Sequence, residues 1–183
     1  MTRRKRIALT IAVLVALQAA VLLIYRAVQR SREEPVRFAA ERLTDSAPAP
    51  TIVGERADGS RVSLSWPARN ARIIHFWGTW CGPCRTELPS LLSFAARMRA
   101  HGVEVVAIAV QDEWTEISAF FGGRVPPEVV VEVDGDAHKR FGVGTLPDTY
   151  LVDRSGKLLE RFHGARDWTS DAARTHLLAS LDQ

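Results

Sequence analysis

The sequence predicts an α/β fold with a central mixed sheet flanked by helices, an N-terminal β-hairpin extension and one preceding transmembrane helix. Three observations lead to this prediction. The length of 183 residues suffices for one ordinary domain. An apolar stretch occupies residues 7–25. Over the rest of the chain, short apolar runs alternate with helical patterns.

The head of the chain predicts a membrane anchor. Residues 7–25 would form a helix about 28 Å long, close to the roughly 30 Å hydrocarbon core of a bilayer. Basic residues at 3–6 favour a cytoplasmic tail at 1–6, with the body of the chain on the other side. The sequence around Gln18 does not fit a small-x-small cleavage site, so we favour an uncleaved signal anchor over a cleaved signal peptide.

A polar segment follows the anchor and ends in alternating alanine and proline, which predicts a tether at 26–46 and a domain at 47–183. The net charge is +3, but nine Lys/Arg against four Asp/Glu through Asp45 leave the predicted domain mildly acidic. A duplex-binding protein needs a basic face on its folded part, so nucleic acid is excluded as a partner. A composition of 46% hydrophobic and 25% charged residues excludes a disordered chain.

The predicted domain begins with a hairpin and a buried strand. Apolar residues at 51–53 and 61–64 flank Asp58-Gly59, a strong hairpin signal. The run at 72–77 is almost continuously apolar, as in a strand that is covered on both faces. We therefore expect this strand at the centre of the sheet.

A helix is predicted next, from Cys81–Cys84 to about Ala100, with Gly102 placed to cap its C-terminal end. The apolar residues at 103–110 predict a second buried strand. Asp112 could cap a following helix that runs through Phe121.

The last third of the chain repeats this alternation. The expected elements are a short strand at 128–133, a short helix at 137–141, a hairpin of strands at 149–152 and 157–162, and a helix to Leu181 capped by Thr169 or Ser170. Strands joined both by helices and by hairpins imply a mixed sheet.

Both cysteines lie in Trp80-Cys81-Gly82-Pro83-Cys84, where the predicted central strand gives way to a helix. Thiol–disulfide exchange needs a thiolate, and the unpaired N–H groups and dipole of a helix N-terminus favour that anion. Cys81 would project outward as the nucleophile. Cys84, about one turn along, would resolve the mixed disulfide and close a Cys81–Cys84 disulfide.

Half a zinc site and a purely structural disulfide are the alternatives for this pair. Zinc would need two further ligands, but no other cysteine exists and the five histidines are scattered without ligand spacing. Closing so short a loop removes little entropy from the unfolded chain, so a structural disulfide would contribute little. We therefore expect redox chemistry with no metal and no cofactor.

The segment 76–89, FWGTWCGPCRTELP, resembles the active-site segment of the thioredoxin superfamily. More narrowly, it resembles the TlpA/ResA-like group of membrane-anchored, extracytoplasmic thiol–disulfide oxidoreductases. A second matching block, GVGTLPDTYLVD, occupies residues 142–153 and is followed by Gly156. The resemblance covers roughly residues 47–181, includes the anchor and tether, and implies a thioredoxin-like sandwich.

The resemblance implies roles for single residues. Cys81 would be the attacking thiol and Cys84 the resolving one. Pro147 would be a cis-proline that packs beside the disulfide, with Thr145 and Leu146 presenting backbone to an extended substrate segment. The other residues of the predicted substrate-binding surface are Trp80, Gly82 and Pro83.

Glu87 matches an acid that this group keeps near the buried cysteine. It lies one helical turn after Cys84, so its carboxylate could move a proton to or from that thiol; the alternative is a solvated helix residue. His75 stands where cytoplasmic thioredoxins carry an aspartate, and we favour a hydrogen-bonded core histidine over a catalytic one. Asp148 is expected to line the rim of the site, and Trp77 to lie in the core.

These residues predict an enzyme that reduces protein disulfides outside the cytoplasm. The resemblance implies apocytochrome c or metalloproteins under assembly as substrates, and a membrane thiol-reducing partner of the CcdA/DsbD type. It also implies a bacterial cytoplasmic membrane, with the domain facing the periplasm or cell exterior. The dipeptide Gly82-Pro83 resembles that of reducing thioredoxins, and this resemblance implies a reductase and not an oxidase or isomerase of the same fold.

Two other classes of protein fit the sequence less well than a disulfide reductase. Peroxiredoxins place Thr or Ser three residues before their reactive cysteine and Pro further upstream, where this chain has Gly78 and Ile74, so a peroxidase is rejected. A non-catalytic metallochaperone of the same fold usually separates its cysteines by three residues and recruits a histidine. The CxxC spacing argues against that class.

Overall fold

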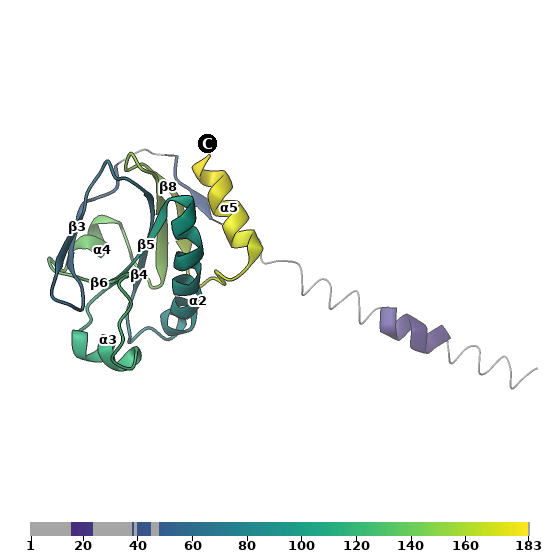
Figure 1. Ribbon diagram of the computed structural model, residues 1–183. Coiled ribbons are helices and arrows are strands. Elements are labelled where there is room, and N and C mark those ends of the chain that lie inside the picture. The colour runs from purple at the N-terminus through teal and green to yellow at the C-terminus, as the bar shows by residue number, and fades with distance from the viewer. Residues whose placement is uncertain (1–15, 24–37, 39, 45–47, 183) are drawn as a thin grey trace, which may run out of the picture. The chain divides into compact units, whose positions relative to one another are not determined.

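The computed structural model describes residues 16–23, 38, 40–44 and 48–182 (Figure 1). These residues fall into two units, one within Met1–Arg37 and the other within Phe38–Gln183. In the first unit, residues 16–23 are helical and exposed. Among the described residues, no helix has both the length and the hydropathy needed to cross a membrane. The predicted tail at 1–6 and most of the predicted anchor at 7–25 lie outside the described residues, so the anchor stays a prediction.

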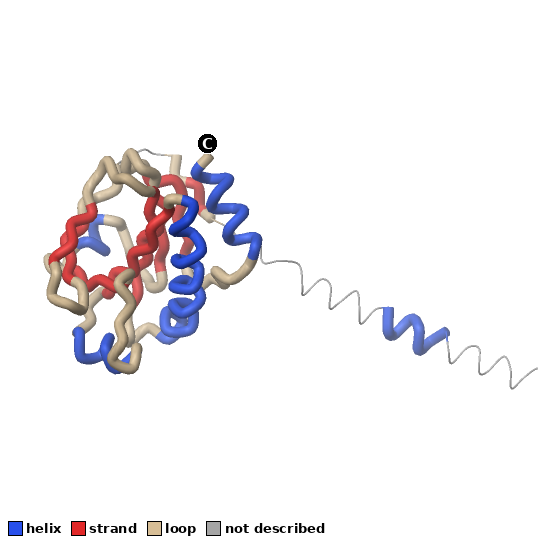
Figure 2. The backbone as a smooth tube through the Cα atoms, viewed as in Figure 1, coloured by secondary structure: helices blue, strands red, loops and turns tan. Residues whose placement is uncertain are grey.

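The second unit is built on one eight-stranded sheet (Figure 2). In spatial order its strands are β1 (Glu41–Arg42), β8 (Leu158–His163), β7 (Asp148–Val152), β4 (Ala71–Trp77), β5 (Val103–Ala109), β6 (Val129–Glu132), β2 (Ile52–Glu55) and β3 (Arg61–Leu64). Strand β4 is parallel to β5 and antiparallel to β7. The predicted mixed sheet, with the 72–77 strand near its centre, is confirmed.

Helices cover both faces of this sheet. They are α2 (Gly82–Met98), the 3-10 helix η1 (Arg99–His101), α3 (Trp114–Phe120), α4 (Ala137–Arg140) and α5 (Asp171–Leu181). Side chains of α2 and α5 join one core cluster, and Ala137 of α4 joins the other. On β4, Ile73 and Trp77 belong to the first cluster, whereas Ile74 and Phe76 belong to the second, because successive side chains alternate.

The folded unit begins earlier than the predicted boundary at residue 47. The Phe38 ring is only 8% exposed and packs against Phe162 and Trp168 in the first core cluster. Strand β1 pairs antiparallel with β8, opposite Glu160 and Arg161. Part of the predicted tether at 26–46 therefore belongs to the sheet. A two-residue strand is too short to show a period in the sequence.

Several local predictions are confirmed. Both hairpins form, as β2–β3 and β7–β8. The hydroxyl of Ser170 caps α5 by accepting a hydrogen bond from the N–H of Ala173 at 3.2 Å. Gly102 adopts a left-handed φ of 71° at the end of η1, the conformation that favours glycine there.

The prediction that Asp112 caps the following helix is wrong. Helix α3 begins at Trp114, with Glu113 in the N-cap position. The Asp112 carboxylate instead accepts hydrogen bonds from the backbone N–H and the hydroxyl of Thr79, 33 positions away in the chain. The Asp112 carboxylate, which the local sequence pattern predicts as the cap of α3, is thus engaged by a residue from a distant part of the chain.

The expectation that Asp148 lines the rim of the site is also wrong, because its carboxylate is only 1% exposed. Arg161 on the neighbouring strand β8 donates to it from Nε at 3.1 Å and from Nη2 at 2.6 Å. The same Nη2 donates to the carbonyl oxygen of Gly142 at 2.9 Å. The pair therefore connects strand β7 to the start of the loop that carries Pro147.

We predict that Arg161→Met destabilises the oxidised protein by about 3 kcal/mol at pH 7, because the buried Asp148 carboxylate loses its cation. Urea unfolding measures the change. The control is Arg174→Met, which breaks a 3.6 Å pair with the exposed Asp171 and should cost no more than about 0.5 kcal/mol. Equal losses in the two variants would refute the importance of the buried pair.

Candidate active site

Cys81 and Cys84 form a disulfide at the N-terminus of α2, with a Cα–Cα distance of 5.3 Å. Cys81 is the N-cap residue, and its Sγ accepts a hydrogen bond from the N–H of Cys84 at 3.3 Å. Pro83 lies in the first turn, where its missing N–H leaves no bond unmade. Cys81 is 7% exposed and Cys84 is fully buried. An external disulfide can therefore reach Cys81 more readily than Cys84.

The loop before Cys81 is braced from the end of β5. Asp112 accepts from the backbone N–H of Thr79 at 2.5 Å and from its Oγ1 at 2.9 Å. The indole Nε1 of Trp80 donates to the carbonyl oxygen of Val110 at 3.1 Å. The Trp80 residue remains 59% exposed next to the disulfide. Trp80 is therefore accessible, as its predicted place on the substrate-binding surface requires, and its contact with a substrate stays a prediction.

The structure explains why a glycine stands at position 78, three residues before Cys81. A Cβ at this position would lie 2.7 Å from Nε1 and 2.8 Å from Cε2 of the Trp80 ring. A side chain at position 78 would therefore displace the ring of Trp80, the residue that directly precedes Cys81. Threonine or serine, the residues expected here in a peroxidase, would not fit beside Trp80 in this arrangement.

A groove of about 490 Å³ opens beside Trp80, and no sequence pattern predicts it. Its lining includes Thr79, Trp80, Arg85, Asp112, Glu116 and Phe120. The Arg85 guanidinium lies over the Phe120 ring, 5.5 Å from its centroid. These residues come from separate segments of the chain, so only the fold brings them together.

The second predicted block, residues 142–153, contains the predicted cis-proline. The Leu146–Pro147 peptide bond is cis, as the resemblance implies. Pro147 is buried, Thr145 is exposed, and the half-buried Leu146 packs against the cluster that contains both cysteines. The carbonyl oxygen of Pro147 accepts from the N–H of Gly164 at 3.0 Å. The roles of Thr145 and Leu146 toward a substrate stay predictions.

Glu87 is buried, which excludes the solvated helix residue that the sequence left open. Its residue exposure is 3%, on the same face of α2 as Cys84 and Leu88. Its Oε1 accepts hydrogen bonds from the indole Nε1 of Trp168 at 2.5 Å and from the backbone N–H of Arg166 at 3.1 Å. Sequence spacing does not reveal these partners, because they lie about 80 positions further along the chain.

Burial raises the pKa of Glu87 from its ordinary 4.5 to about 7. The hydrogen bonds from Trp168 and Arg166, together with the positive charge of Arg166, lower this pKa, but desolvation outweighs them. A carboxyl group with a pKa near neutrality can both accept and release a proton at pH 7. Such a carboxyl group is suited to exchange a proton with the thiol of Cys84, one helical turn away.

His75 lies on β4, and its imidazole is fully buried. Its Nδ1 is 2.9 Å from Oγ1 of Thr149, which is its register partner on β7. Burial lowers the pKa of His75 to about 3, so the ring is neutral at physiological pH. These contacts are those of the hydrogen-bonded core histidine that the sequence favoured.

Three other histidines pair with glutamates. The pairs are His138–Glu132 at 2.6 Å, His163–Glu41 at 3.0 Å and His176–Glu160 at 2.8 Å. Over the described part of the chain, no group of three or more His, Cys, Asp or Glu residues could hold a metal ion.

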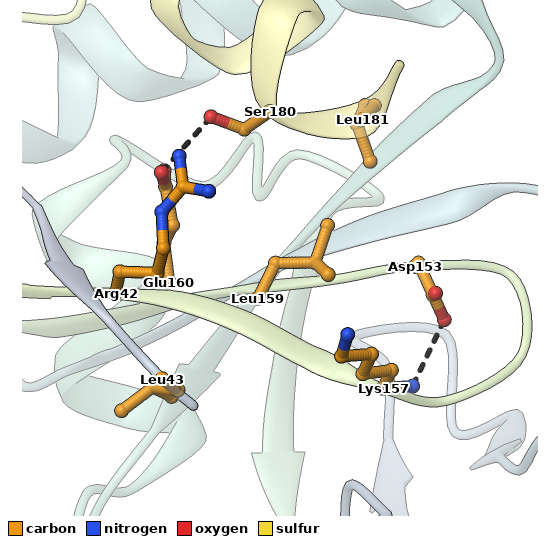
Figure 3. Close-up of a pocket in the computed structure, with 8 residues that line it drawn as sticks. All are labelled: Arg42, Leu43, Asp153, Lys157, Leu159, Glu160, Ser180 and Leu181. Atoms are coloured by element: carbon orange, nitrogen blue, oxygen red, sulfur yellow. Dashed lines mark hydrogen bonds between the residues drawn. The ribbon is translucent and has the colours of Figure 1, made fainter. Parts of the chain in front are cut away.

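A separate cavity of about 260 Å³ lies where β1, β8 and α5 meet (Figure 3). Charged and polar side chains line it, among them Arg42, Asp153, Lys157, Glu160 and Ser180. Ser180 donates to Glu160 at 2.9 Å, and the backbone N–H of Lys157 donates to Asp153 at 2.9 Å. None of its lining residues comes from the α2 N-terminus or from the Pro147 loop, so it is distinct from the disulfide site.

The buried Glu87 predicts a pH dependence of stability. Because its folded pKa of about 7 lies above 4.5, the folded state retains a proton that the unfolded state has lost, and stability falls as pH rises between these values. Relative to Glu87→Gln, the unfolding free energy of the oxidised wild type should fall by about 2–3 kcal/mol from pH 5 to pH 8. Urea titrations at both pH values measure it, and parallel pH profiles would contradict it.

Comparison with known proteins identifies the family to which this chain belongs. Residues 46–161 match the AhpC/TSA family. The thiol-disulfide oxidoreductase ResA of Bacillus subtilis (strain 168) is 31% identical over 123 residues, which cover 66% of this chain and 68% of that protein. ResA of Geobacillus thermodenitrificans (strain NG80-2) is 30% identical over 132 residues, covering 70% of this chain and 74% of its own length.

Among solved structures, a protein from Chlorobium tepidum, described as a thiol:disulfide interchange protein DsbE, aligns with a TM-score of 0.65 and 29% identity. The alignment covers 78% of this chain and 99% of that one. The thioredoxin fold, the disulfide at the start of α2 and the sequence match agree with one another. The chain belongs to the AhpC/TSA family and is a TlpA/ResA-like thiol–disulfide oxidoreductase.

Proposed function

We propose that this protein reduces protein disulfides outside the cytoplasm through Cys81 and Cys84. The observation that carries the proposal is the asymmetry of the pair: Cys81 is 7% exposed, whereas Cys84 is fully buried on the helix face that also buries Glu87. A substrate disulfide would react with Cys81, and Cys84 would then resolve the mixed disulfide from within the protein. The names of the relatives, thiol-disulfide oxidoreductases, support the same reaction class.

In the proposed reaction the reduced pair donates two electrons. The Cys81 thiolate attacks one sulfur of the substrate disulfide, the substrate S–S bond breaks, and the released substrate thiolate takes up a proton. Cys84 then loses its proton and attacks Cys81 Sγ. The mixed disulfide breaks, the second substrate sulfur leaves as a thiolate and takes up a proton, and the Cys81–Cys84 disulfide forms. The N-terminal position of Cys81 on α2 favours the thiolate that starts this sequence.

Glu87 supplies the base for the second step. Cys84 is buried, so water does not readily carry its proton away. The Glu87 carboxyl group lies one turn along the same helix face and has a pKa of about 7. In its ionised form it accepts the proton of Cys84, and it returns a proton when the pair is reduced again.

Exposed groups around the disulfide form the proposed contact surface for the substrate. Trp80, Gly82, Pro83 and Thr145 are all exposed. An extended substrate segment would lie along the backbone of Thr145 and Leu146, as the resemblance implies. The groove beside Trp80 gives room for side chains that flank the substrate cysteine.

The cellular setting is also a proposal. Residues 7–25 would anchor the chain in the bacterial cytoplasmic membrane, and the oxidoreductase unit would face the periplasm or the cell exterior. Each turnover leaves an oxidised pair, so a thiol reductant must restore it. A membrane protein of the CcdA/DsbD type would supply these electrons, and apocytochrome c or a metalloprotein under assembly would receive them.

We predict that Cys84→Ser accumulates a mixed disulfide with a protein substrate, because Cys81 still attacks but nothing resolves the product. Cys81→Ser, the matched control, should accumulate none. Both variants are reduced, mixed with insulin, quenched with acid, and compared on a non-reducing gel and by mass spectrometry. Full insulin-reductase activity in both variants would refute the proposed mechanism.

The direction of electron flow predicts a low reduction potential. A reductant should lie near the value of about −270 mV typical of thioredoxin, whereas a dedicated oxidant lies near about −120 mV. Equilibration of the full chain with glutathione or dithiothreitol buffers, read by thiol alkylation, measures the value. A potential near that of dedicated oxidants would reverse the assignment and make this protein an oxidase.

A further inference from the structure

The loop between β8 and α5 is fastened to α2 next to the redox pair. The indole Nε1 of Trp168 and the backbone N–H of Arg166 both donate to Oε1 of Glu87, at 2.5 and 3.1 Å. One turn along the helix, Ser90 Oγ accepts from the backbone N–H of Trp168 at 3.4 Å. Two turns further on, Arg97 donates to the carbonyl oxygen of Trp168 at 2.9 Å. Trp168 is thus held to α2 by its backbone as well as by its side chain.

The Trp168 indole is held from its other sides by aromatic rings. It is fully buried, and the ring centroids of Phe38, Phe162 and Phe94 lie 4.9, 5.6 and 5.7 Å from its own. A side chain packed in this way has little room to change rotamer. Its N–H is therefore a fixed donor aimed at one atom of Glu87.

The two oxygens of the Glu87 carboxyl group differ in their surroundings. Oε1 has two donors, whereas Oε2 is buried and has no hydrogen-bond partner among the described residues. When the group is neutral, Oε1 must remain an acceptor for both donors, so the proton resides on Oε2.

We propose that Trp168 is a positioning residue for proton transfer: by holding Oε1, it leaves Oε2 as the atom that exchanges a proton with Cys84. This inference rests on the proposed function and on Glu87 as the base of its second step. The proton leaves Cys84 Sγ for Oε2, so the thiol becomes a thiolate and the carboxylate becomes a neutral acid.

The groups that act on Glu87 allow the effect of Trp168 to be isolated. The Trp168 and Arg166 donors and the Arg166 charge favour the carboxylate, while burial opposes it, and Cys84 lies one turn away on the same helix. Removal of the indole N–H takes away one donor and leaves the others. The pKa of Glu87 should then rise further, by about one unit.

The test compares Trp168→Phe with Trp77→Phe in the full chain. Trp77 is fully buried in the same core cluster, but its Nε1 has no hydrogen-bond partner among the described residues, so it is a matched control. Carboxyl ¹³C NMR reports the Glu87 titration, and stopped-flow measurement of mixed-disulfide resolution reports its pH profile. Trp168→Phe should raise both midpoints by about one unit and slow resolution about fivefold at pH 7.

Trp77→Phe should leave both midpoints at their wild-type values. Unchanged midpoints in Trp168→Phe, or equal shifts in both variants, would overturn the proposal.

A measurement on the wild type decides the case in which Trp168→Phe does not fold. The Trp168 indole N–H resonance should move with the Glu87 titration and become flat in Glu87→Gln, while the Trp77 resonance stays flat throughout. A flat Trp168 resonance in the wild type would overturn the positioning role.

These readouts also separate this inference from the proposed function. If Glu87→Gln resolves the mixed disulfide at the wild-type rate at every pH, Glu87 is not the base, and the inference falls while disulfide reduction stands. If Cys84→Ser accumulates no mixed disulfide, the proposed function itself falls, together with the inference that rests on it.

Discussion

The packing of α2 against the centre of the sheet is the constraint on which the whole site depends. The helix buries a stripe that includes Cys84, Glu87, Leu88 and Leu91, and its N-terminus follows closely after the central strand β4. Because Leu88 and Leu91 must face the core, the rotation of the helix about its axis is set. That rotation turns Cys84 inward, places Glu87 on the same buried face, and leaves Cys81 at the N-cap with 7% of its surface exposed. The different roles of the two thiols follow from this orientation.

The same burial governs the acid–base properties of the site. Desolvation raises the pKa of Glu87 to about 7 even though two donors and a cation favour its ionised form. The same effect lowers the pKa of His75 to about 3. One group is therefore able to exchange protons near neutrality, and the other stays neutral. Burial disfavours the charged form in both cases, but the charged form is the deprotonated one for the acid and the protonated one for the base.

Most elements of the fold could be predicted because their signals are local. A continuous apolar run indicates β4, Asp58-Gly59 indicates a hairpin turn, and Ser170 stands at the start of a helical pattern. The errors concern residues whose partners are distant in the chain. The Asp112 carboxylate accepts a hydrogen bond from Thr79 instead of capping the helix that follows it. Asp148 is buried and forms an ion pair with Arg161 on the adjacent strand. Strand β1 exists only because β8 offers it an edge.

The chemistry of the site could be read from the residue pattern, since two cysteines at a strand-to-helix junction already indicate a thiolate nucleophile and a resolving thiol. The surroundings that tune this chemistry could not be read in that way. Whether Glu87 is solvated or buried depends on the loop that carries Trp168, 81 positions away. Short-range spacing records which face of a helix is apolar, but the solvation of a carboxyl group depends on what covers that face. That cover comes from chain segments brought together only when the sheet and its helices pack.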